Sequence, residues 1–341
     1  MKTIIKLITC CMVIIMGCAA PKKGMVGPNK QEPWRALHLL GYYQDENLAD
    51  FEKTIPGLAE KGINVLVLEV DYHFQYASHP ELRQEDKQIT VQGAKRFADF
   101  CRKHDIRLVI EFQCFGHQSW AEETYPLLIQ YPEFDVTPDA FPNNENIYCR
   151  EWNPYNPKVH KIIFELIDEL IDAFSADAIH VGMDEVFLIN NENSVIKDKD
   201  PAEVYAKVVN DFYHHLVEKR EVEMLMWGDR LIDGNQYDYG EWESSLNGTA
   251  GAVDMIPNDI IICDWHYEIR ETYPSIEMFI EKGFRVLPTS FRDVEACTRL
   301  IKYSQKFNNP KVLGHLFTSW SRLEEPLEYP PLKKCIRLVN N

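Results

Sequence analysis

Two acidic residues stand side by side where an apolar segment of the chain ends. Asp184 and Glu185 follow the run Ala178–Met183, which contains His180 and Gly182. Two neighbouring carboxylates repel each other when both are charged, so one of them tends to hold a proton at neutral pH. A protonated acid beside an ionised one is the arrangement that glycosidic bond cleavage uses. Asp-Glu pairs are also common on protein surfaces, so the meaning of this pair depends on the element that carries it.

Short β-branched apolar runs alternate with longer amphipathic runs from residue 33 onward. This alternation predicts parallel strands joined by helical crossovers. The predicted strands are Ala36–Leu40, Asn64–Val70, Arg107–Phe112, Ala178–Val181, Glu223–Trp227, Ile260–Asp264, Arg285–Pro288 and Val312–Phe317. Because eight strands close a barrel, we predict a (β/α)8 TIM barrel, with one catalytic domain over residues 33–341. An open doubly wound sheet competes with it, but the chain has no glycine-rich phosphate-binding turn.

Apolar residues between the strands recur at helical spacing. Two such series are Leu48, Phe51, Ile55 and Leu58, and Ile162, Leu166, Leu170 and Phe174. These series predict helices with one apolar face turned toward the barrel.

Polar and aromatic residues follow the predicted strands at the point where each strand ends. They are Asp71, His117, Asp184, Glu185, Trp227, Asp229, Trp265, Tyr267 and Trp320. Because a TIM barrel places its active site at the carboxyl ends of its strands, we expect these residues to meet at one mouth. Taken singly, each has an ordinary structural alternative as a packed aromatic ring, a hydrogen-bonded histidine or a helix cap.

The composition narrows the class of partner. The chain has 341 residues, a formal net charge of -17, 45% apolar residues and seven tryptophans. This charge argues against nucleic acid and against electrostatic docking on anionic lipid, whereas an uncharged polymer such as a glycan fits. The cysteines beyond the leader form no C-x-x-C pair and no zinc-finger spacing, so we predict no metal site. One or two disulfides are possible, and the sequence does not assign their cysteines.

The first residues have the pattern of an export signal. Lys2 and Lys6 precede a short apolar stretch, and the segment ends Ile15-Met16-Gly17-Cys18. This ending resembles a bacterial lipobox, so we predict a lipoprotein signal peptide over residues 1–18 with lipidation of Cys18. Residues 19–32 contain prolines and lysines and predict a flexible tether. We therefore expect an exported protein held at the bacterial membrane, in the periplasm or at the cell surface, only through this lipid anchor.

Four stretches carry a resemblance to a known family. The segment His180-Val181-Gly182-Met183-Asp184-Glu185 resembles the His-x-Gly-x-Asp-Glu motif of glycoside hydrolase family 20, the β-N-acetylhexosaminidases. Supporting stretches are Asn64–Leu66 with Asp71 and Pro80–Leu82, the segment Phe115–Trp120, and Trp227–Asp229. The resemblance covers roughly residues 34 to 325.

The resemblance implies a retaining exo-glycosidase that needs no metal and no organic cofactor. Glu185 would be the general acid, and Asp184 would orient the 2-acetamido group of the substrate, whose carbonyl oxygen attacks the anomeric carbon. The predicted wall of the sugar site consists of Trp227, Trp265 and Trp320. Asp71, His117 and Asp229 are candidates for hydroxyl contacts or for tuning the acid.

Three positions depart from the family pattern. No Arg follows the first strand, in Leu39–Tyr43. Arg322 stands after the last strand, where the family has Glu, which favours a substrate with a negative group such as a sulfated sugar. No Tyr follows the seventh strand, so Tyr267 is the predicted partner of the acetamido carbonyl, with an ordinary half-buried tyrosine as the alternative.

Two further interpretations stay open. The first is a lipoprotein that binds acetamido sugars on a degenerate barrel without cleaving them. The second is a glycosidase for another sugar that uses two conventional carboxylates, with a second acid as the partner of Glu185. The candidates for that second acid are Glu69, Asp71, Glu111 and Asp229.

Overall fold

Eight parallel strands form a closed barrel in a computed structural model that describes residues 32–84 and 88–340. The strands are β1 (Trp34–Leu39), β2 (Val65–Glu69), β3 (Arg107–Cys114), β6 (Ala178–Gly182), β7 (Glu223–Trp227), β8 (Ile261–Trp265), β9 (Arg285–Ser290) and β10 (Gly314–Phe317). Each strand pairs with its neighbours in chain order, and β1 closes the ring on β10 with Trp34 opposite Gly314. The predicted TIM barrel is confirmed, and each of the eight predicted strands overlaps an observed one.

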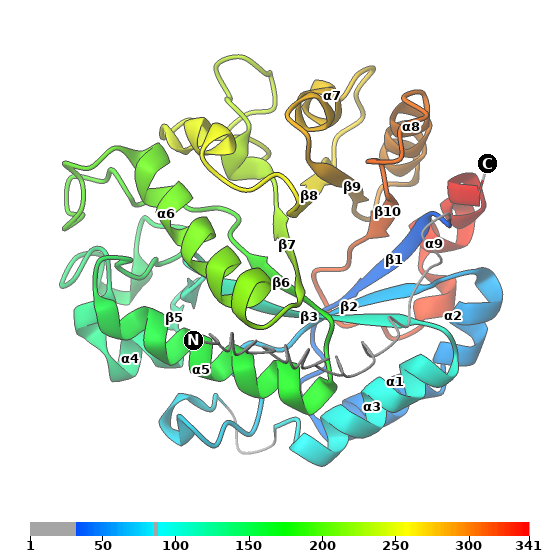
Figure 1. Ribbon diagram of the computed structural model, residues 1–341, viewed down its shortest axis with the longest axis horizontal. Coiled ribbons are helices and arrows are strands. Elements are labelled where there is room, and N and C mark those ends of the chain that lie inside the picture. The colour runs from blue at the N-terminus through cyan, green and yellow to red at the C-terminus, as the bar shows by residue number, and fades with distance from the viewer. Residues whose placement is uncertain (1–31, 85–87, 341) are drawn as a thin grey trace, which may run out of the picture.

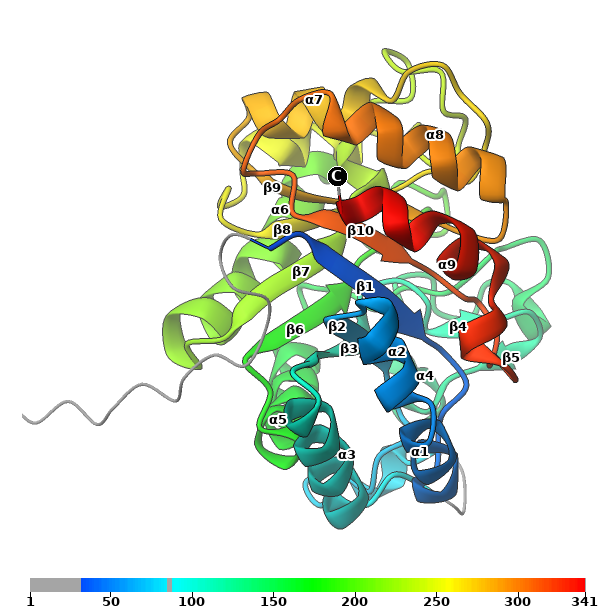
Figure 2. The same cartoon turned by 90° about the vertical axis from the view of Figure 1, so that its right-hand side faces the viewer.

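Helices surround the strands in a ring (Figure 1). They are α1 (Asp45–Glu52), α2 (Ile55–Lys61), α3 (Val91–Lys103), α4 (Pro126–Gln130), α5 (Pro157–Phe174), α6 (Pro201–Tyr213), α7 (Pro274–Glu281), α8 (Val294–Gln305) and α9 (Pro330–Cys335). A short hairpin, β4 (Ser119–Trp120) and β5 (Glu123–Thr124), follows β3. Figure 2 shows α9 beside α8, next to the seam between β10 and β1.

Side-chain caps explain where several of the longer helices begin. Asn156 accepts a hydrogen bond from the backbone of α5, Asp200 from that of α6, and Asp293 from that of α8. Each cap satisfies an amide that the helix itself cannot pair.

The first predicted apolar series forms two helices rather than one. All four of its residues are buried, but the helix is interrupted between the end of α1 and the start of α2. Pro56 lies in the first turn of α2, where proline is tolerated because its missing N–H has no helical partner there.

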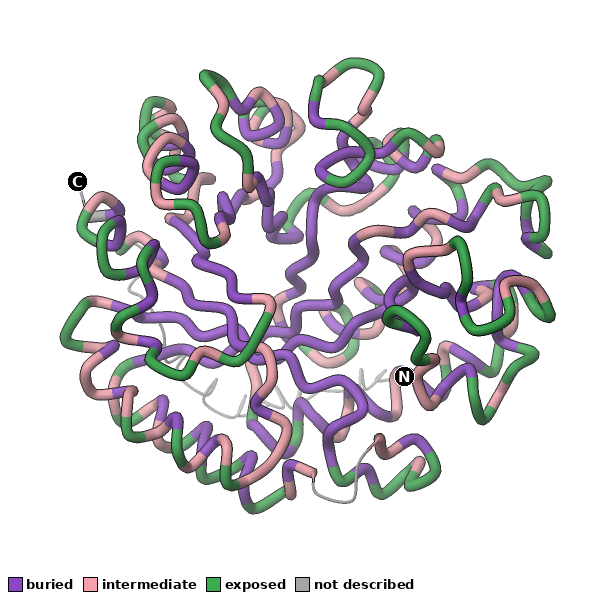
Figure 3. The backbone as a smooth tube through the Cα atoms, turned by 180° about the vertical axis from the view of Figure 1, so that it is seen from behind, coloured by how far each residue is buried: buried purple, intermediate pink, exposed green. Residues whose placement is uncertain are grey.

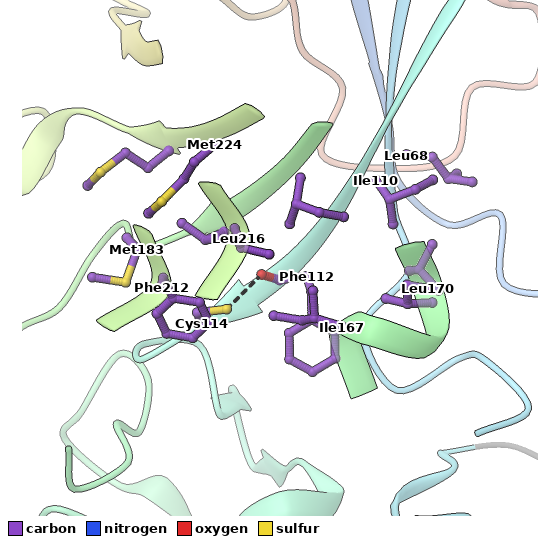
Figure 4. Close-up of a cluster of buried hydrophobic side chains, with 14 of the residues drawn as sticks. Leu68, Ile110, Phe112, Cys114, Ile167, Leu170, Met183, Phe212, Leu216 and Met224 are labelled. Atoms are coloured by element: carbon purple, nitrogen blue, oxygen red, sulfur yellow. Dashed lines mark hydrogen bonds between the residues drawn. The ribbon is translucent and has the colours of Figure 1, made fainter. Parts of the chain in front are cut away.

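Alternate strand residues separate two apolar layers. Leu66 and Leu68 of β2 face the helices, whereas Val65 and Val67 face the barrel axis. Figure 4 shows the outer layer, in which Leu68 lies near side chains of β3 and α5. Figure 3 shows the strands buried along most of their length, with the exposed positions in helices and loops. The barrel therefore gives the strand ends a rigid base.

Within residues 32–84 and 88–340, we find no helix long and apolar enough to cross a membrane. The predicted signal peptide and Cys18 lie outside the described residues, as does the tether apart from its last residue.

Candidate active site

The carboxyl end of the barrel gathers the residues that were expected there. Asp71 follows β2, His117 follows β3, and Asp184 and Glu185 follow β6. From the other strands come Trp227 and Asp229 at β7, Trp265 and Tyr267 at β8, and Trp320 after β10. Because the strands are parallel, all of these positions lie at one end of the barrel, where TIM barrels place their chemistry.

His117 lies between the two adjacent carboxylates. Its Nε2 atom is 3.1 Å from Oε2 of Glu185 and 3.3 Å from Oδ2 of Asp184, at angles that make neither contact a well-formed hydrogen bond. Burial alone would lower the pKa of His117, but the charge of Asp184 and the contacts with both acids hold this pKa well above its usual value. The two acids therefore favour the protonated form of His117.

The Asp184 carboxyl has a spare acceptor. Asp184 is 6% exposed, and its Oδ1 atom has no hydrogen-bond partner within the described part of the chain. A buried acceptor without a partner costs free energy, so such atoms concentrate where a ligand supplies the missing donor.

The loop that carries the acid pair has a strained backbone. Gly182 has a φ of +64°, and a Cβ atom at this position would lie 1.7 Å from Oε1 of Gln113, so another residue would be strained and would displace the Gln113 side chain. Met183 and Glu185 also have positive φ values, of 77° and 52°. Residues in this region cost about 1–3 kcal/mol each and persist only where their surroundings hold them.

Asp229 holds this loop from the next strand. Its Oδ2 atom accepts hydrogen bonds from the Glu185 backbone N–H at 3.0 Å and from Nε of Arg230 at 2.6 Å. Its Oδ1 atom accepts from the indole of Trp265 at 3.2 Å. Asp229 is 1% exposed, and burial raises its pKa to about 6. Because both oxygens bind protein donors, these contacts favour the second predicted role of Asp229, tuning of the acid, over contact with substrate hydroxyls.

Beneath the pair, Glu111 anchors a buried polar layer inside the barrel. Its Oε2 atom lies 2.8 Å from Nε2 of His38, and its Oε1 atom accepts from Trp227 at 2.9 Å and lies 3.1 Å from Nδ1 of His180. Burial would raise the pKa of Glu111, but His180 and His38 outweigh burial and hold this pKa well below its usual range. With both oxygens engaged, Glu111 has no free atom for a substrate.

Asp71 and Glu69 form a second acidic pair at the end of β2. Asp71 accepts a hydrogen bond from the Gln113 backbone at 2.7 Å, and burial raises the pKa of Asp71 to about 7. Burial, followed by the charges of Asp71 and Glu111, raises the pKa of Glu69 well above its usual value. These carboxyls can hold protons close to the acid pair near neutral pH.

Among the residues that the structure describes, two groups of side chains have a spacing that would suit a cation. In each group the ligand atoms lie within 4.8 Å of one another, among His38, Glu69 and Glu111, and among His117, Asp184 and Glu185. In the first group, the hydrogen bonds of Glu111 already occupy its oxygens. In the second, His117 faces both acids and neutralises part of their charge.

The predicted aromatic wall divides into a floor and a rim. Trp227 is completely buried and lies 5.7 Å from the partly exposed Trp320, so Trp227 forms the floor. The Trp320 indole donates a hydrogen bond to the Tyr267 hydroxyl at 2.9 Å, and Trp265 lies 4.8 Å from the Tyr267 ring. Glu243 accepts from the Tyr267 backbone at 2.9 Å, which holds this tyrosine at the end of β8.

Arg322 is exposed and lies over the ring of Tyr42, 5.4 Å from its centroid. Burial raises the pKa of Tyr42 to about 12, and the nearby Arg322 charge opposes this rise. The Arg322 backbone packs against Gly41, whose φ is +85°. A Cβ atom on Gly41 would lie only 2.9 Å from Cβ of Arg322. The recorded contacts of Arg322 thus lie beside the end of β1, where the family pattern places its own arginine.

Sequence reasoning missed three aromatic residues beside the site, Trp120, Tyr148 and Trp242. Burial and the charge of Glu185 raise the pKa of Tyr148, and its ring lies 5.4 Å from Trp120 and 4.8 Å from Trp242. Trp120 ends the Phe115–Trp120 segment and could have been noted there, but nothing in the spacing of the other two indicated this position.

The barrel and its paired carboxylates place the chain in the class of TIM-barrel proteins whose site lies at the carboxyl ends of the strands. Residues 48–297 match the model of glycosyl hydrolase family 20, catalytic domain. The chain belongs to this family, as its motifs predicted.

Two beta-hexosaminidases are similar to the chain at low sequence identity. A beta-hexosaminidase of Emericella nidulans is 22% identical over 276 residues, which cover 76% of this chain and 43% of that protein. A beta-hexosaminidase of Akkermansia muciniphila is 23% identical over 181 residues, which cover 48% of this chain and 36% of that protein. The chain spans less than half the length of these curated relatives.

Solved structures share the fold. A beta-N-acetylhexosaminidase from Bacteroides fragilis has a TM-score of 0.61 at 12% identity, over 91% of this chain and 66% of that chain. Another beta-N-acetylhexosaminidase has a TM-score of 0.66 at 17% identity, over 91% of this chain and 72% of that chain. At such identities the likeness supports the architecture alone.

Proposed function

We propose that the protein is a retaining exo-glycosidase that releases terminal β-linked N-acetylhexosamine from glycans. Membership of family 20 supports the class of reaction. The observation that carries the mechanism is the buried Oδ1 atom of Asp184, an acceptor with no partner in the described chain. An acetamido N–H is a donor of the kind that this atom lacks.

The proposed reaction has two steps. In the first, Glu185 protonates the glycosidic oxygen, the bond to the anomeric carbon breaks, and the acetamido carbonyl oxygen bonds to that carbon. Asp184 accepts the acetamido N–H and stabilises the positive oxazolinium ring that results. In the second, Glu185 takes a proton from a water that attacks the same carbon, which reopens the ring and retains the configuration.

Neighbouring residues hold these two acids in place. His117 faces both carboxylates, and Asp229 binds the Glu185 backbone. Asp71, whose pKa of about 7 results chiefly from burial, tunes the charge around His117. Tyr267 donates its hydroxyl to the acetamido carbonyl, with Trp227, Trp265 and Trp320 around the sugar.

The test is hydrolysis of aryl β-N-acetylglucosaminide and aryl β-N-acetylgalactosaminide. Glu185→Gln should lower kcat by about 10²–10⁴-fold, the usual contribution of a general acid. Glu192→Gln is the matched control, because Glu192 is exposed in the same loop after β6. Equal rates for wild type and Glu185→Gln would remove Glu185 from the mechanism.

The 2-acetamido group separates the proposal from its alternatives. Aryl glycosides that lack this group should not be cleaved, because the substrate then carries no nucleophile. Cleavage of such glycosides would favour a mechanism with two conventional carboxylates, for which Glu111 and Asp229 are poor partners because their oxygens bind protein donors. Binding of acetamido sugars without any product would favour the sugar-binding lipoprotein.

Arg322 carries a separate proposal about the substrate. Its position beside the end of β1 supports an ionic contact with a negative group, such as a sulfate on the terminal sugar. Equal values of kcat/KM on sulfated and unsulfated acetamido sugars would contradict this contact.

We also propose export and lipid anchoring at the bacterial membrane through Cys18, on the strength of the leader pattern. Cys18→Ser should move the protein from the membrane fraction to the soluble fraction. Retention of the variant at the membrane would contradict the proposed anchor.

A further inference from the structure

A buried polar cluster lies behind Tyr267, at the end of β8. We use the name polar cluster for Glu243, Asp264, His266 and Ser275. Asp264 lies in β8, and His266 follows this strand. Ser275 lies in the first turn of α7, and Glu243 comes from the loop between β7 and β8. Each of the four residues is at most 5% exposed, so their polar atoms depend on one another for partners.

The directions of the hydrogen bonds show where the protons of the cluster lie. Nδ1 of His266 is 2.8 Å from Oε2 of Glu243, and an ionised carboxylate only accepts, so Nδ1 carries a proton. The Ser275 hydroxyl gives its one proton to Oδ2 of Asp264 at 2.8 Å. Oγ of Ser275 must therefore accept from Nε2 of His266, which is also 2.8 Å away. This arrangement favours a proton on both ring nitrogens of His266.

The electrostatics of the cluster agree with this assignment. Burial alone would lower the pKa of His266, but the charges and hydrogen bonds of Asp264 and Glu243 raise this pKa to about 9. Burial would raise the pKa of Glu243, but His266 outweighs burial and keeps this pKa below its usual value. Nη2 of Arg270 also donates to Oε2 of Glu243, at 3.3 Å. Glu243 is thus a carboxylate held between an imidazole and a guanidinium group.

Glu243 connects the polar cluster to the mouth of the barrel. Its Oε1 atom accepts the backbone N–H of Tyr267 at 2.9 Å, while its Oε2 atom faces His266. The strand ends at Trp265, and the N–H of His266 still bonds to the carbonyl of Thr289 in β9. Glu243 therefore supplies the acceptor for the first backbone N–H beyond the sheet. Because both oxygens belong to one rigid carboxylate, the contact with His266 limits where Oε1 can lie.

The Tyr267 hydroxyl is placed by its backbone and by the packing of its ring. The ring lies 4.8 Å from Trp265 and 5.4 Å from Phe291, which follows β9. The Trp320 indole donates to the hydroxyl at 2.9 Å, and an indole N–H can only donate, so the tyrosine oxygen is the acceptor there. The hydroxyl proton is left for a second partner, which in the proposed function is the acetamido carbonyl oxygen.

We propose that Glu243 is a positioning residue for Tyr267. The inference rests on the proposed function, because it takes the Tyr267 hydroxyl as the donor to the acetamido carbonyl. Glu243 is buried and acts through this tyrosine, not through contact with the sugar. Its effect on the rate should therefore disappear when the Tyr267 hydroxyl is absent. An anchor for its own loop, in contrast, would affect the rate with or without that hydroxyl.

The experiment is a double-mutant cycle on the full chain, with an aryl β-N-acetylglucosaminide as the substrate. Tyr267→Phe removes one donor to the developing charge and should lower kcat about 10²-fold. Glu243→Ala removes the backbone acceptor and should lower kcat at least about tenfold through misplacement of the hydroxyl. The double variant should be no slower than Tyr267→Phe alone, because the two residues act through one hydroxyl.

Three further variants separate positioning from a general loss of structure. Glu243→Gln keeps an oxygen that can accept the Tyr267 N–H and should restore most of kcat. Glu243→Asp keeps the charge but is one methylene shorter, so it cannot reach both partners; it should repeat the loss in kcat and serves if the alanine variant does not fold. Glu241→Gln is the matched control, because Glu241 is exposed in the same loop, and it should leave kcat unchanged.

The possible failures are distinguishable. If the losses of Glu243→Ala and Tyr267→Phe multiply in the double variant, Glu243 acts through other contacts, and the positioning proposal is overturned while the proposed function stands. Wild-type kcat in both Glu243→Ala and Glu243→Asp overturns it as well. Wild-type kcat in Tyr267→Phe removes the tyrosine as the donor, and the positioning proposal with it. If the wild type cleaves no acetamido glycoside, the proposed function itself fails.

Discussion

Asp229→Asn tests whether the buried network behind Glu185 controls the rate. Asp229 receives three donors, from the Glu185 backbone, Arg230 and Trp265, and offers them two oxygens. An asparagine offers one oxygen and one NH₂ group. In the better of its two orientations, the asparagine amide places its oxygen where it still accepts hydrogen bonds from the Glu185 backbone and Arg230. The Trp265 indole then faces the NH₂ group and loses its acceptor.

The expected cost follows from these contacts. A lost hydrogen bond costs about 1 kcal/mol, and a buried arginine without its charged partner costs about 3–5 kcal/mol. Arg230 still donates to the carbonyls of Glu241, Trp242 and Ser244, so the lower end of this range applies. We therefore expect the free energy of unfolding to fall by about 4 kcal/mol, from the lost hydrogen bond and the lower end of the arginine range.

The same change should act on catalysis through the position of the acid. A displacement of roughly 1 Å in a reacting group lowers kcat about 10²-fold. KM should change little, because Asp229 is 1% exposed and its oxygens bind protein donors. The assay is steady-state hydrolysis of an aryl β-N-acetylglucosaminide, with urea unfolding measured on the same samples.

The pH dependence gives an independent check. Because burial raises the pKa of Asp229 to about 6, wild-type Asp229 is ionised above this pH and protonated below it. The charge pair with Arg230 is thus present at pH 7.5 and largely lost at pH 5. The ratio of kcat between wild type and Asp229→Asn should therefore shrink as the pH falls through about 6.

A control lies on the same strand at the other end of the barrel. Glu223 begins β7. It accepts a hydrogen bond from Arg285 at 2.6 Å and forms an ion pair with Arg107 at 2.7 Å. Glu223→Gln should lower stability and leave kcat unchanged. A kcat of Asp229→Asn within about threefold of wild type would refute the positioning role. A raised KM at constant kcat would instead favour the other predicted role of Asp229, contact with sugar hydroxyls.

Two further predictions concern stability. Gly182→Ala should lower the free energy of unfolding in urea by at least about 1–2 kcal/mol, because φ is +64° and the new Cβ would collide with Gln113; an unchanged midpoint would contradict it. Burial raises the pKa of Glu151 from 4.5 to about 8, so the folded state binds more protons than the unfolded state between these values, and stability falls as the pH rises through them. Glu151→Gln should flatten this slope in denaturation at pH 5 and 8, and a slope equal to wild type would count against the assignment.

The strands were predictable because their apolar runs are short, β-branched and separated by amphipathic segments. The location of the site could also be predicted, because parallel strands bring their last residues to one end of the barrel. The break between α1 and α2, from Glu52 to Ile55, was not anticipated, because the apolar spacing continues across it while the backbone turns. Periodicity reports which face is buried, not where a helix stops.

The contacts that set the chemistry were harder to predict, since they join residues without a shared motif. Asp229 was assigned to the substrate because its position follows a strand, but its carboxylate orientation depends on Arg230 and Trp265. Tyr148 and Trp242 lie on long loops, and their meeting at 4.8 Å depends on how two excursions fold over the barrel. Contacts of this kind depend on tertiary packing. They leave no periodic pattern in the sequence from which they could be predicted.

His117 alters the electrostatic interaction between Asp184 and Glu185. Two isolated carboxylates would force a proton onto one of them by repulsion. Nε2 of His117 lies 3.1 Å from one acid and 3.3 Å from the other, so protonation of His117 relieves that repulsion and the protons of these three groups are coupled. In the proposed mechanism, an acetamido N–H that binds Asp184 would compete with His117 for the charge of that carboxylate. Binding of the sugar would then redistribute the charge of the cluster as Glu185 releases its proton, which would link recognition of the acetamido group to bond cleavage.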